Sequence, residues 1–426
     1  MATTSIPAGS ALAIKQFSVA LFTLTQRQPS LTKNLTGPAP QQSAAESKLK
    51  GQSSPDMPIV RVTDLSKTEG DMVSIDLINI IGGKPIMGDR MAEGMGEPLS
   101  FSSMDVRIDL TTKVVDSGGK MTNQRTRHNL RGLSMANLAG WFNRWDAQGS
   151  LVHMAGARGS QQGVDWVIPQ PADPDFTEIM VNPVKAPTYN RHYVANGLGI
   201  TQGGLQLGSI ASTDLLKIEH LDELSTLLAD MEFKMQPIKI VDDLAANDDP
   251  LYLMLVSHRA WKHVLTNTTN AVWRTFLQNA WNRKSYGSKH PLFSGEAGMW
   301  NGILVRKMDR AIRFLPGDVT KVVLVANRYT ATESDQTVNA GLGAGFGVDR
   351  CLLLGAQALA NVYGRNQNSD YYMSWMERRY NFNRNLEVAG ECMGGKAKTR
   401  FNVPDGAGNN EPTDHGVLAF DVAVKL

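Results

Sequence analysis

The sequence is poor in features that would tie it to a membrane, an oxidising compartment or a strongly charged partner. Its 426 residues include only two cysteines, Cys351 and Cys392, which excludes a disulfide framework and favours a reducing compartment. No apolar run reaches the roughly 20 residues that a membrane helix needs, so we expect no membrane partner. Lys and Arg number 43 against 41 Asp and Glu, a balance that gives no strong overall attraction to nucleic acid.

Motifs for catalysis or metal binding are also missing. The sequence has no Cys-x-x-Cys pair for a zinc site and no Gly-x-Ser-x-Gly nucleophile turn. His258 and His263 are five residues apart, whereas two ligands on one helical face need a spacing of four. The acidic segment 405–414 lacks the spacing of a calcium loop, and we interpret it as a turn. We therefore predict no catalytic residue, no metal ligand and no cofactor.

The most glycine-rich segment, residues 339–347, has a composition like that of phosphate-binding loops. Such loops bring backbone N–H groups close to phosphates and are followed by Lys and then Ser or Thr. Here Asp349 and Arg350 follow instead, and the residues before the segment are polar. We interpret it as a flexible loop and keep a nucleotide-dependent enzyme as a minor alternative. A phosphate site is also only weakly indicated by three basic residues further on, Lys396, Lys398 and Arg400.

The N-terminal residues 1–60 differ in composition from the rest of the chain. Residues 11–24 place Ile14, Phe17 and Leu21 at helical spacing, and Lys15 interrupts them, so we expect a short amphipathic helix rather than a secretory signal. Residues 27–58 contain five prolines and few apolar side chains, too few to fold alone. We expect residues 1–60 to form an arm held by neighbouring chains. The alternative is an arm that wraps around its own domain.

Two segments with alternating apolar residues, 72–77 and 104–111, predict the strands of a long hairpin. Residues 82–103 between them contain five glycines and two prolines, and a connection this long usually has a function. The stability of a lone hairpin in water is marginal, so we expect this hairpin to rest on a partner. The alternative is a hairpin that folds onto the sheet of its own chain. Adaptable methionines and charges make up the candidate contact residues at its tip: Lys84, Met87, Asp89, Arg90, Met91, Glu93, Met95 and Glu97.

After a break at residues 117–119, an apolar stripe over residues 124–148 predicts a helix about 35 Å long, which Thr122 would cap. Its first turns are basic, which is unfavourable for the helix dipole. We therefore expect these charges to pair with acidic groups elsewhere, unless they simply form a solvated face. The helix contributes four candidate site residues: Arg125, Arg131, Trp141 and Trp145.

The remaining sequence mixes helices and strands. Residues 150–211 are rich in proline and glycine and predict short strands and loops. Helices are predicted at 218–231, opened by Ser212 or Thr213, and at 258–265 and 271–282. Strands are predicted at 237–241, 251–256, 302–307, 321–326, 371–377 and 416–424, and residues 351–363 are an apolar run. Strands interleaved with helices indicate an α+β or α/β architecture.

The order of these elements resembles the HK-97 capsid fold, and the residues are similar to those of one family with that fold, the phage N-4-type major capsid proteins. In the hairpin and helix the similar positions are Gly70, Asp71, Gly88, Asp89, Glu93, Gly94, Glu97, Gln124, Arg125, Leu130, Arg131 and residues 138–141. Later ones are residues 291–295, Gly298, Gly302 and residues 354–358, 398–401 and 414–417.

The resemblance implies an α+β chain with five parts. These are an N-terminal arm (1–60), an E-loop hairpin (61–120), a spine helix with the peripheral domain (121–215), a mainly axial domain (216–370), and C-terminal strands (371–426) that return to the peripheral and axial core. The implied function is that of a major capsid protein of a tailed double-stranded DNA bacteriophage, made in the host bacterial cytoplasm.

Such a protein self-assembles as hexamers and pentamers into the icosahedral head shell of the virion, without catalysis. Besides copies of itself, the resemblance implies portal, scaffold and decoration proteins as candidate partners, and non-specific contact with the packaged DNA. The alternative is another phage assembly protein, such as a portal or tail component.

Overall fold

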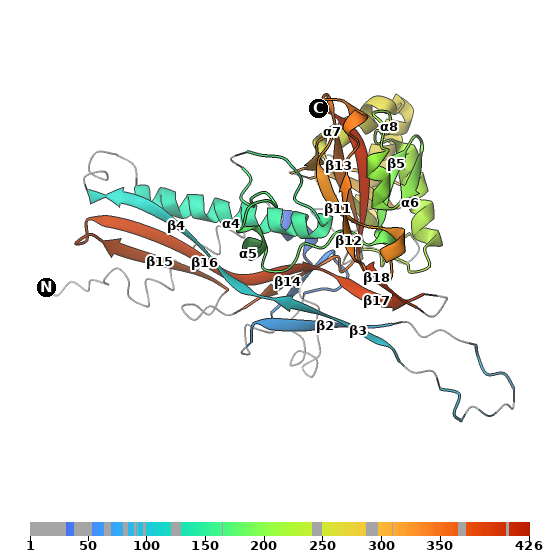
Figure 1. Cartoon of the computed structure of the whole chain (residues 1–426), viewed down its shortest axis with the longest axis horizontal. Coiled ribbons are helices and arrows are strands. Elements are labelled where there is room, and N and C mark those ends of the chain that lie inside the picture. The colour runs from blue at the N-terminus through green and yellow to red at the C-terminus, as the bar shows by residue number, and fades with distance from the viewer. Residues whose placement is uncertain are drawn as a thin grey trace.

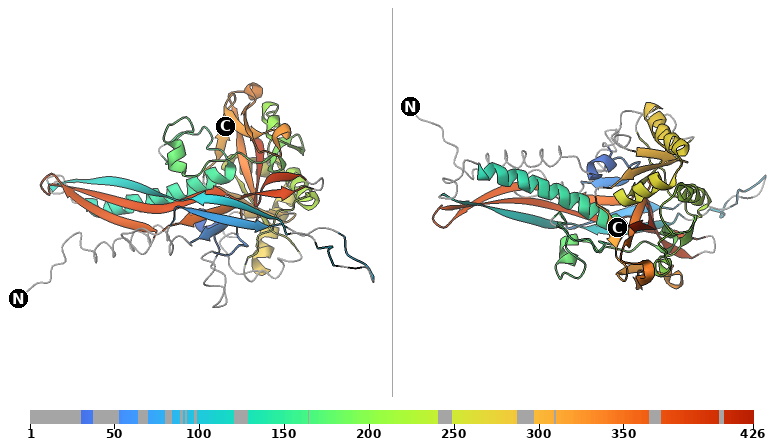
Figure 2. Two further views of the ribbon diagram at one scale, coloured as in Figure 1. Left: turned by 60° about the horizontal axis from the view of Figure 1, so that its bottom comes forward. Right: turned by 90° about the horizontal axis from the view of Figure 1, so that it is seen from above.

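The computed structural model describes residues 31–37, 53–63, 70–79, 84–88, 91, 93–96, 99–120, 129–163, 165–240, 249–286, 297–308, 310–364, 372–405 and 409–426. Within them the chain forms two main sheets, which we call the broad sheet and the long sheet, in an elongated molecule (Figure 1). The long sheet extends toward one end beside a long helix. The broad sheet and its helices form the bulkier part at the other end (Figure 2).

The broad sheet has the strand order β6-β5-β19-β13-β7-β9-β8, with β10 paired to β13. Its strands are β5 (His192–Asn196), β6 (Gly199–Gln202), β7 (Tyr252–Val256), β8 (Ala297–Trp300), β9 (Ile303–Lys307), β10 (Ile312–Phe314), β13 (Phe346–Leu354) and β19 (Val417–Lys425). Neighbours are antiparallel except β5 with β19 and β7 with β9. The C-terminal strand β19 therefore lies inside the sheet.

Both faces of the broad sheet are buried, which explains why its central strands read as continuous apolar runs. In β13, Cys351 and Leu353 belong to one core cluster and Leu352 and Leu354 to the other. The first face is covered by α6 (Ile218–Asp230), α7 (His258–Asn267) and α8 (Asn270–Tyr286). The second is covered by the end of α4 (Leu130–Ala155) and by α2 (Leu31–Leu35).

The long sheet has the order β1-β14-β16-β15, with β4 also paired to β16. Its strands are β1 (Ile59–Val62), β4 (Asp109–Gly119), β14 (Leu359–Tyr363), β15 (Met373–Tyr380) and β16 (Asn385–Lys398). The helix α4 lies along this sheet, where Leu138 packs with Trp375 and Val388, and Phe142 with Met373 and Cys392. Its 26 residues span about 39 Å.

The boundaries of α4 differ from the prediction. The helix begins at Leu130, where the Asn129 side chain accepts a hydrogen bond from the N–H of Gly132; the predicted start at Gln124 and cap at Thr122 lie outside the described residues. The predicted end at Gln148 is wrong. The helix continues to Ala155 because its last turns are buried under the broad sheet, and Gly156, with φ 64°, ends it.

Three two-stranded hairpins complete the strands. They are β2 (Met72–Ile78) with β3 (Phe101–Arg107), β11 (Val319–Val323) with β12 (Glu333–Thr337), and β17 (Arg400–Pro404) with β18 (Asn410–Asp414). The predicted strand 104–111 is divided at Ile108, whose N–H donates to the carbonyl of Asp71. Beyond it the chain leaves the hairpin and enters the long sheet as β4.

The other predicted elements were confirmed in type except one, and two more begin or end at other residues than predicted. Residues 237–240 form no strand, although Ile238 and Ile240 are buried, because only single backbone hydrogen bonds hold them. The helix α6 begins after Lys217, not at Ser212 or Thr213. The strand predicted at 321–326 is β11, which ends at Val323. The segment 156–211 contains α5 (Phe176–Met180) besides short strands. Among the described helices none is long and apolar enough to cross a membrane.

Candidate assembly surfaces

The base of the β2–β3 hairpin is fixed to its own chain. The backbone N–H and carbonyl of Arg107 both bond to the side-chain amide of Asn182, each at 2.9 Å. Val106 is fully buried beside Val62, Val362 and other residues of the long sheet. This half of the hairpin therefore rests on its own sheet, as in the alternative interpretation of the sequence.

The tip of the hairpin is different, because its apolar side chains face solvent. Met87, Met91 and Met95 are 68%, 72% and 68% exposed, and Phe101 is 64% exposed. Of the other predicted tip residues, Lys84 and Glu93 are exposed, while Asp89, Arg90 and Glu97 lie outside the described residues. An apolar patch on a projecting arm (Figure 1) is typical of a surface that another molecule covers.

The predicted residues of the spine helix contact the long sheet. Trp141 and Trp145 stack with ring centroids 6.4 Å apart, and the ammonium of Lys396 lies 5.1 Å from the centroid of the Trp145 ring. Both tryptophans are half-buried. Arg131 forms an ion pair with Glu377 of β15, which confirms, for this residue, that the basic end of the helix finds acidic partners. Arg125 lies outside the described residues.

Three segments that are far apart in the sequence meet where the two sheets join: residues 354–358, 398–401 and 414–417. The N–H of Gly355 donates to the carbonyl of Gly416 at 2.9 Å, and the N–H of His415 donates to that of Thr399 at 3.0 Å. A Cβ on Gly416 would lie 2.2 Å from the carbonyl oxygen of Ala356. The junction therefore has no room for a larger residue at Gly416.

The junction also buries a group of charges. The Asp414 carboxylate lies 2.7 Å from both the Lys398 ammonium and the Arg400 guanidinium. Burial alone would raise the pKa of Asp414, but the two cations hold it below its ordinary value. Burial lowers the pKa of Lys398 to about 8. With Lys396 paired to Asp146 at 2.6 Å, all three basic residues considered for phosphate binding have acidic partners within the chain.

A second buried group links α4 to the broad sheet. Arg350 donates two hydrogen bonds to Asp421 and one to the backbone carbonyl of Ala155, the last residue of α4. His192 lies 2.7 Å from the same carboxylate. Burial lowers the pKa of His192, whereas Arg350 and His192 outweigh burial and keep the pKa of Asp421 well below its usual range.

Sequence reasoning missed these buried charges, although a signal was present. Asp349, Arg350 and Asp421 each interrupt an apolar run, and a charge in the middle of a strand buried on both faces needs a partner. Asp349 pairs with Arg313 at 2.5 Å, and Arg313 lies opposite it in the strand register. The sequence alone does not say which charge lies opposite which.

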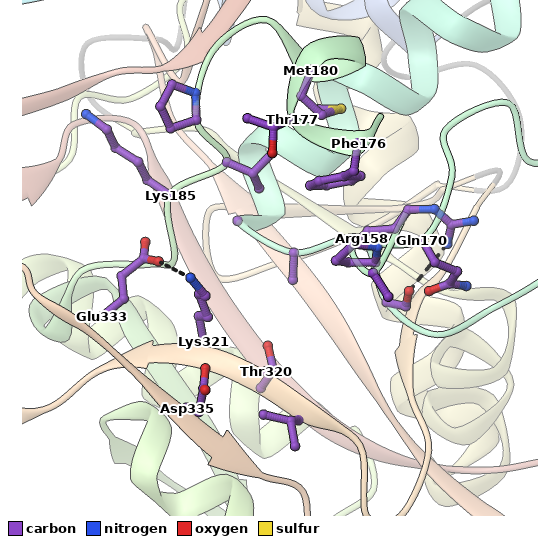
Figure 3. A pocket seen from close by; sticks show the side chains of 18 of the residues that line it. Arg158, Gln170, Phe176, Thr177, Met180, Lys185, Thr320, Lys321, Glu333 and Asp335 are labelled. Carbon is purple, nitrogen blue, oxygen red and sulfur yellow. Dashed lines mark hydrogen bonds and ion pairs between the residues drawn. The ribbon is translucent and has the colours of Figure 1, made fainter. Parts of the chain in front are cut away.

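A cleft of about 940 Å³ lies between residues 156–185 and the β11–β12 hairpin. Figure 3 shows Phe176 and Met180 on one wall, and Lys321 and Glu333 facing each other on another. Glu333 also accepts a hydrogen bond from the N–H of Ala186 at 2.7 Å. The lining of the cleft is mixed apolar and charged, and Glu333 is committed to contacts within the chain.

The motifs considered for chemistry are occupied by structural contacts. In the glycine-rich segment, Asn339 accepts from the N–H of Gly341 at 2.9 Å and donates to the carbonyl of Ile210 at 2.8 Å. Both cysteines are buried and free, and burial raises the pKa of Cys392 to about 12. In the parts of the chain that the structure describes, no three His, Cys, Asp or Glu side chains gather at a common point suited to a metal.

Comparison with solved structures places this fold among phage capsids. The capsid of Ralstonia phage GP4 is 23% identical with a TM-score of 0.68, and the match covers 100% of this chain and 99% of that one. The Cyanophage Pam1 capsid asymmetric unit is 17% identical with a TM-score of 0.58 and full coverage of both chains. The head structure of Helicobacter pylori bacteriophage KHP40 is 10% identical with a TM-score of 0.53, covering 86% and 87%.

No curated protein matches the sequence. A family model described as phage capsid protein matches residues 5–426, almost the whole chain. The mixed helix and sheet fold is HK-97-like, as the resemblance implied. The chain therefore belongs to the phage capsid protein family and is a major capsid protein, a structural component of the head shell.

Proposed function

We propose that the chain is the N-4-type shell subunit of a tailed double-stranded DNA phage. Copies of it assemble as hexamers and pentamers into an icosahedral head, without catalysis. The observation that carries the proposal is the β2–β3 hairpin, whose base is bonded to its own chain at Asn182 while Met87, Met91 and Met95 at its tip are exposed. A rigid base and an adaptable apolar tip suit an arm that lies on a neighbouring copy.

The two sheets support a division of the chain. In this proposal residues 1–60 are the arm and 61–120 the E-loop hairpin, except that β1 and β4 join the long sheet. The long sheet with α4 is the peripheral domain. The broad sheet with its helices is the axial domain, and it includes β5 and β6 from before residue 216. Projecting arms add contact area, and obligate interfaces commonly bury 2,000–5,000 Å².

Further partners follow from the same role. Synthesis in the host cytoplasm, contact with portal, scaffold and decoration proteins, and a shell that encloses DNA without reading its sequence are all part of the proposal. The net charge of +2 fits a container that does not grip its contents strongly.

The test replaces Met87, Met91 and Met95 with Ser in one variant and with Leu in a control that keeps the apolar surface. We expect closed shells from the wild type and the Leu control, and folded but unassembled protein from the Ser variant, by electron microscopy and sedimentation. Unchanged shells from the Ser variant would contradict the role of the hairpin. A ring or a tube from the wild type would instead support the portal or tail alternative.

A further inference from the structure

On one face of the broad sheet, the helix α6 is acidic, whereas the helices α7 and α8 are basic. The helix α6 contains Glu219, Asp222, Glu223 and Asp230 and no Lys or Arg. The helices α7 and α8 contain Arg259, Lys262, Arg274, Arg283 and Lys284 and no Asp or Glu. This segregation is marked in a chain whose total charge is close to zero.

Four of these charges face solvent and do not neutralise each other. Glu219 and Glu223, one helical turn apart, are exposed on α6, and Lys262 and Arg274 are exposed on α7 and α8. Within the described residues none of these four takes part in an ion pair. Asp222 differs, because its carboxylate accepts a hydrogen bond from the indole N–H of Trp300 at 2.8 Å. It therefore has a role inside the chain.

The two surfaces also lie at different places on the domain. The helix α6 contacts β6 and β8, and its Ser225 hydroxyl donates to the carbonyl of Asn301 at 3.0 Å. The helices α7 and α8 contact β19 and β8. Figure 1 shows α6 below and to the side of α8. On α8 the side chain of Trp281 is 73% exposed, a residue type enriched at the energetic centre of interfaces.

We propose that the acidic surface of α6 (Glu219, Glu223) docks on the basic surface of α7 and α8 (Lys262, Arg274, with Trp281) of the next copy in a capsomer ring. A ring needs a head-to-tail interface, in which two different surfaces of the same chain complement each other. Contact of α6 with α6, or of α8 with α8, would instead place like charges together. The inference rests on the proposed capsomer assembly and names the surfaces that make it.

The first experiment reverses each surface in the full-length chain. Glu219→Lys with Glu223→Lys, and separately Lys262→Glu with Arg274→Glu, should each weaken subunit association by roughly tenfold or more, because like charges then meet. Combining all four substitutions in one chain restores opposite charges and should restore assembly. The association constant from sedimentation is the readout, and circular dichroism checks folding. If a charge-reversed variant fails to fold, the same positions are substituted with Gln and the measurement is repeated.

The second experiment mixes the two reversed variants. Neither can form a ring alone, but an alternating ring places opposite charges at every interface. Alternation closes only with an even number of subunits, so hexamers should return in the mixture and pentamers should not. Native mass spectrometry of capsomers separates the two sizes.

The outcomes separate this inference from the proposed function. If the wild type forms shells and each reversed variant assembles as well as the wild type, the inference is wrong while the function stands. If both reversals abolish assembly but neither the four-fold variant nor the mixture recovers, the two surfaces do not contact each other and the inference is again wrong. If the wild type forms no shell or capsomer, the proposed function itself fails.

Discussion

Arg350 and Asp421 lie directly opposite each other in neighbouring strands, joined by two hydrogen bonds of 2.8 Å and both fully buried. Replacing Asp421 with Asn would leave the guanidinium without its counter-charge. We expect the free energy of unfolding to fall by about 3–5 kcal/mol, measured by chemical denaturation of unassembled subunits.

A double variant is the control for that prediction. Arg350→Met with Asp421→Leu removes both charges and keeps apolar volume, so it should cost much less than Asp421→Asn. A loss below about 1 kcal/mol for the single variant would mean that water reaches the pair.

Stability should decrease as the solution is acidified from neutral pH. Burial is the main cause that lowers the pKa of His153 to about 3, of His220 to about 4 and of His415 to about 4. The unfolded chain, with a histidine pKa of about 6.5, then binds more protons than the folded one between about pH 6.5 and these values. The stabilisation is therefore fully present above pH 6.5 and is lost progressively below it. Melting temperatures between pH 8 and pH 4 measure the slope.

A histidine substitution locates the origin of that slope. His153→Gln removes one buried imidazole and should make the pH dependence of stability shallower than in the wild type. A slope equal to that of the wild type would contradict the assignment.

One added methyl group at Gly395 should disturb the packing of the hairpin base on the long sheet. A Cβ at Gly395 would lie 1.8 Å from the carbonyl oxygen of Arg107, so Gly395→Ala should push the hairpin from the long sheet at a cost of about 1–3 kcal/mol. Faster proteolysis within the hairpin is the specific readout. Gly140→Ala, on α4 with no atom within 4 Å of the added carbon, is the matched control. It should stabilise by about 0.5–1 kcal/mol.

The two thiols should be unreactive in the folded chain. Burial raises the pKa of Cys351 and that of Cys392, and reaction with a thiol reagent requires the thiolate and access to it. We expect no labelling at pH 8 until denaturant is added, when both react. Ser103→Cys, at an exposed position of β3, should label at once. Rapid labelling of the native wild type would show that one core opens locally.

Much of the local structure could be predicted because it depends on periodicity. The alternation of Val73, Ile75 and Leu77 indicated a strand, and this face is half-buried in the structure. The spacing of Leu221, Leu224 and Leu228 indicated a helix, and this face is buried. Element ends were less accurate where burial, rather than a capping residue, decides them. The continuation of α4 to Ala155 is one case, since its last turns are stabilised by the broad sheet.

By itself, then, the sequence determined the order of the elements, the projecting hairpin and the family resemblance, because these are carried by neighbouring residues. Only the tertiary structure decided that β4 and β15 both pair with β16, that Arg350 meets Asp421, and that the hairpin is fixed at its base but exposed at its tip. The β4–β16 pairing and the Arg350–Asp421 contact join residues tens to hundreds of positions apart. Which partner each finds depends on the packing of the whole chain rather than on any local pattern.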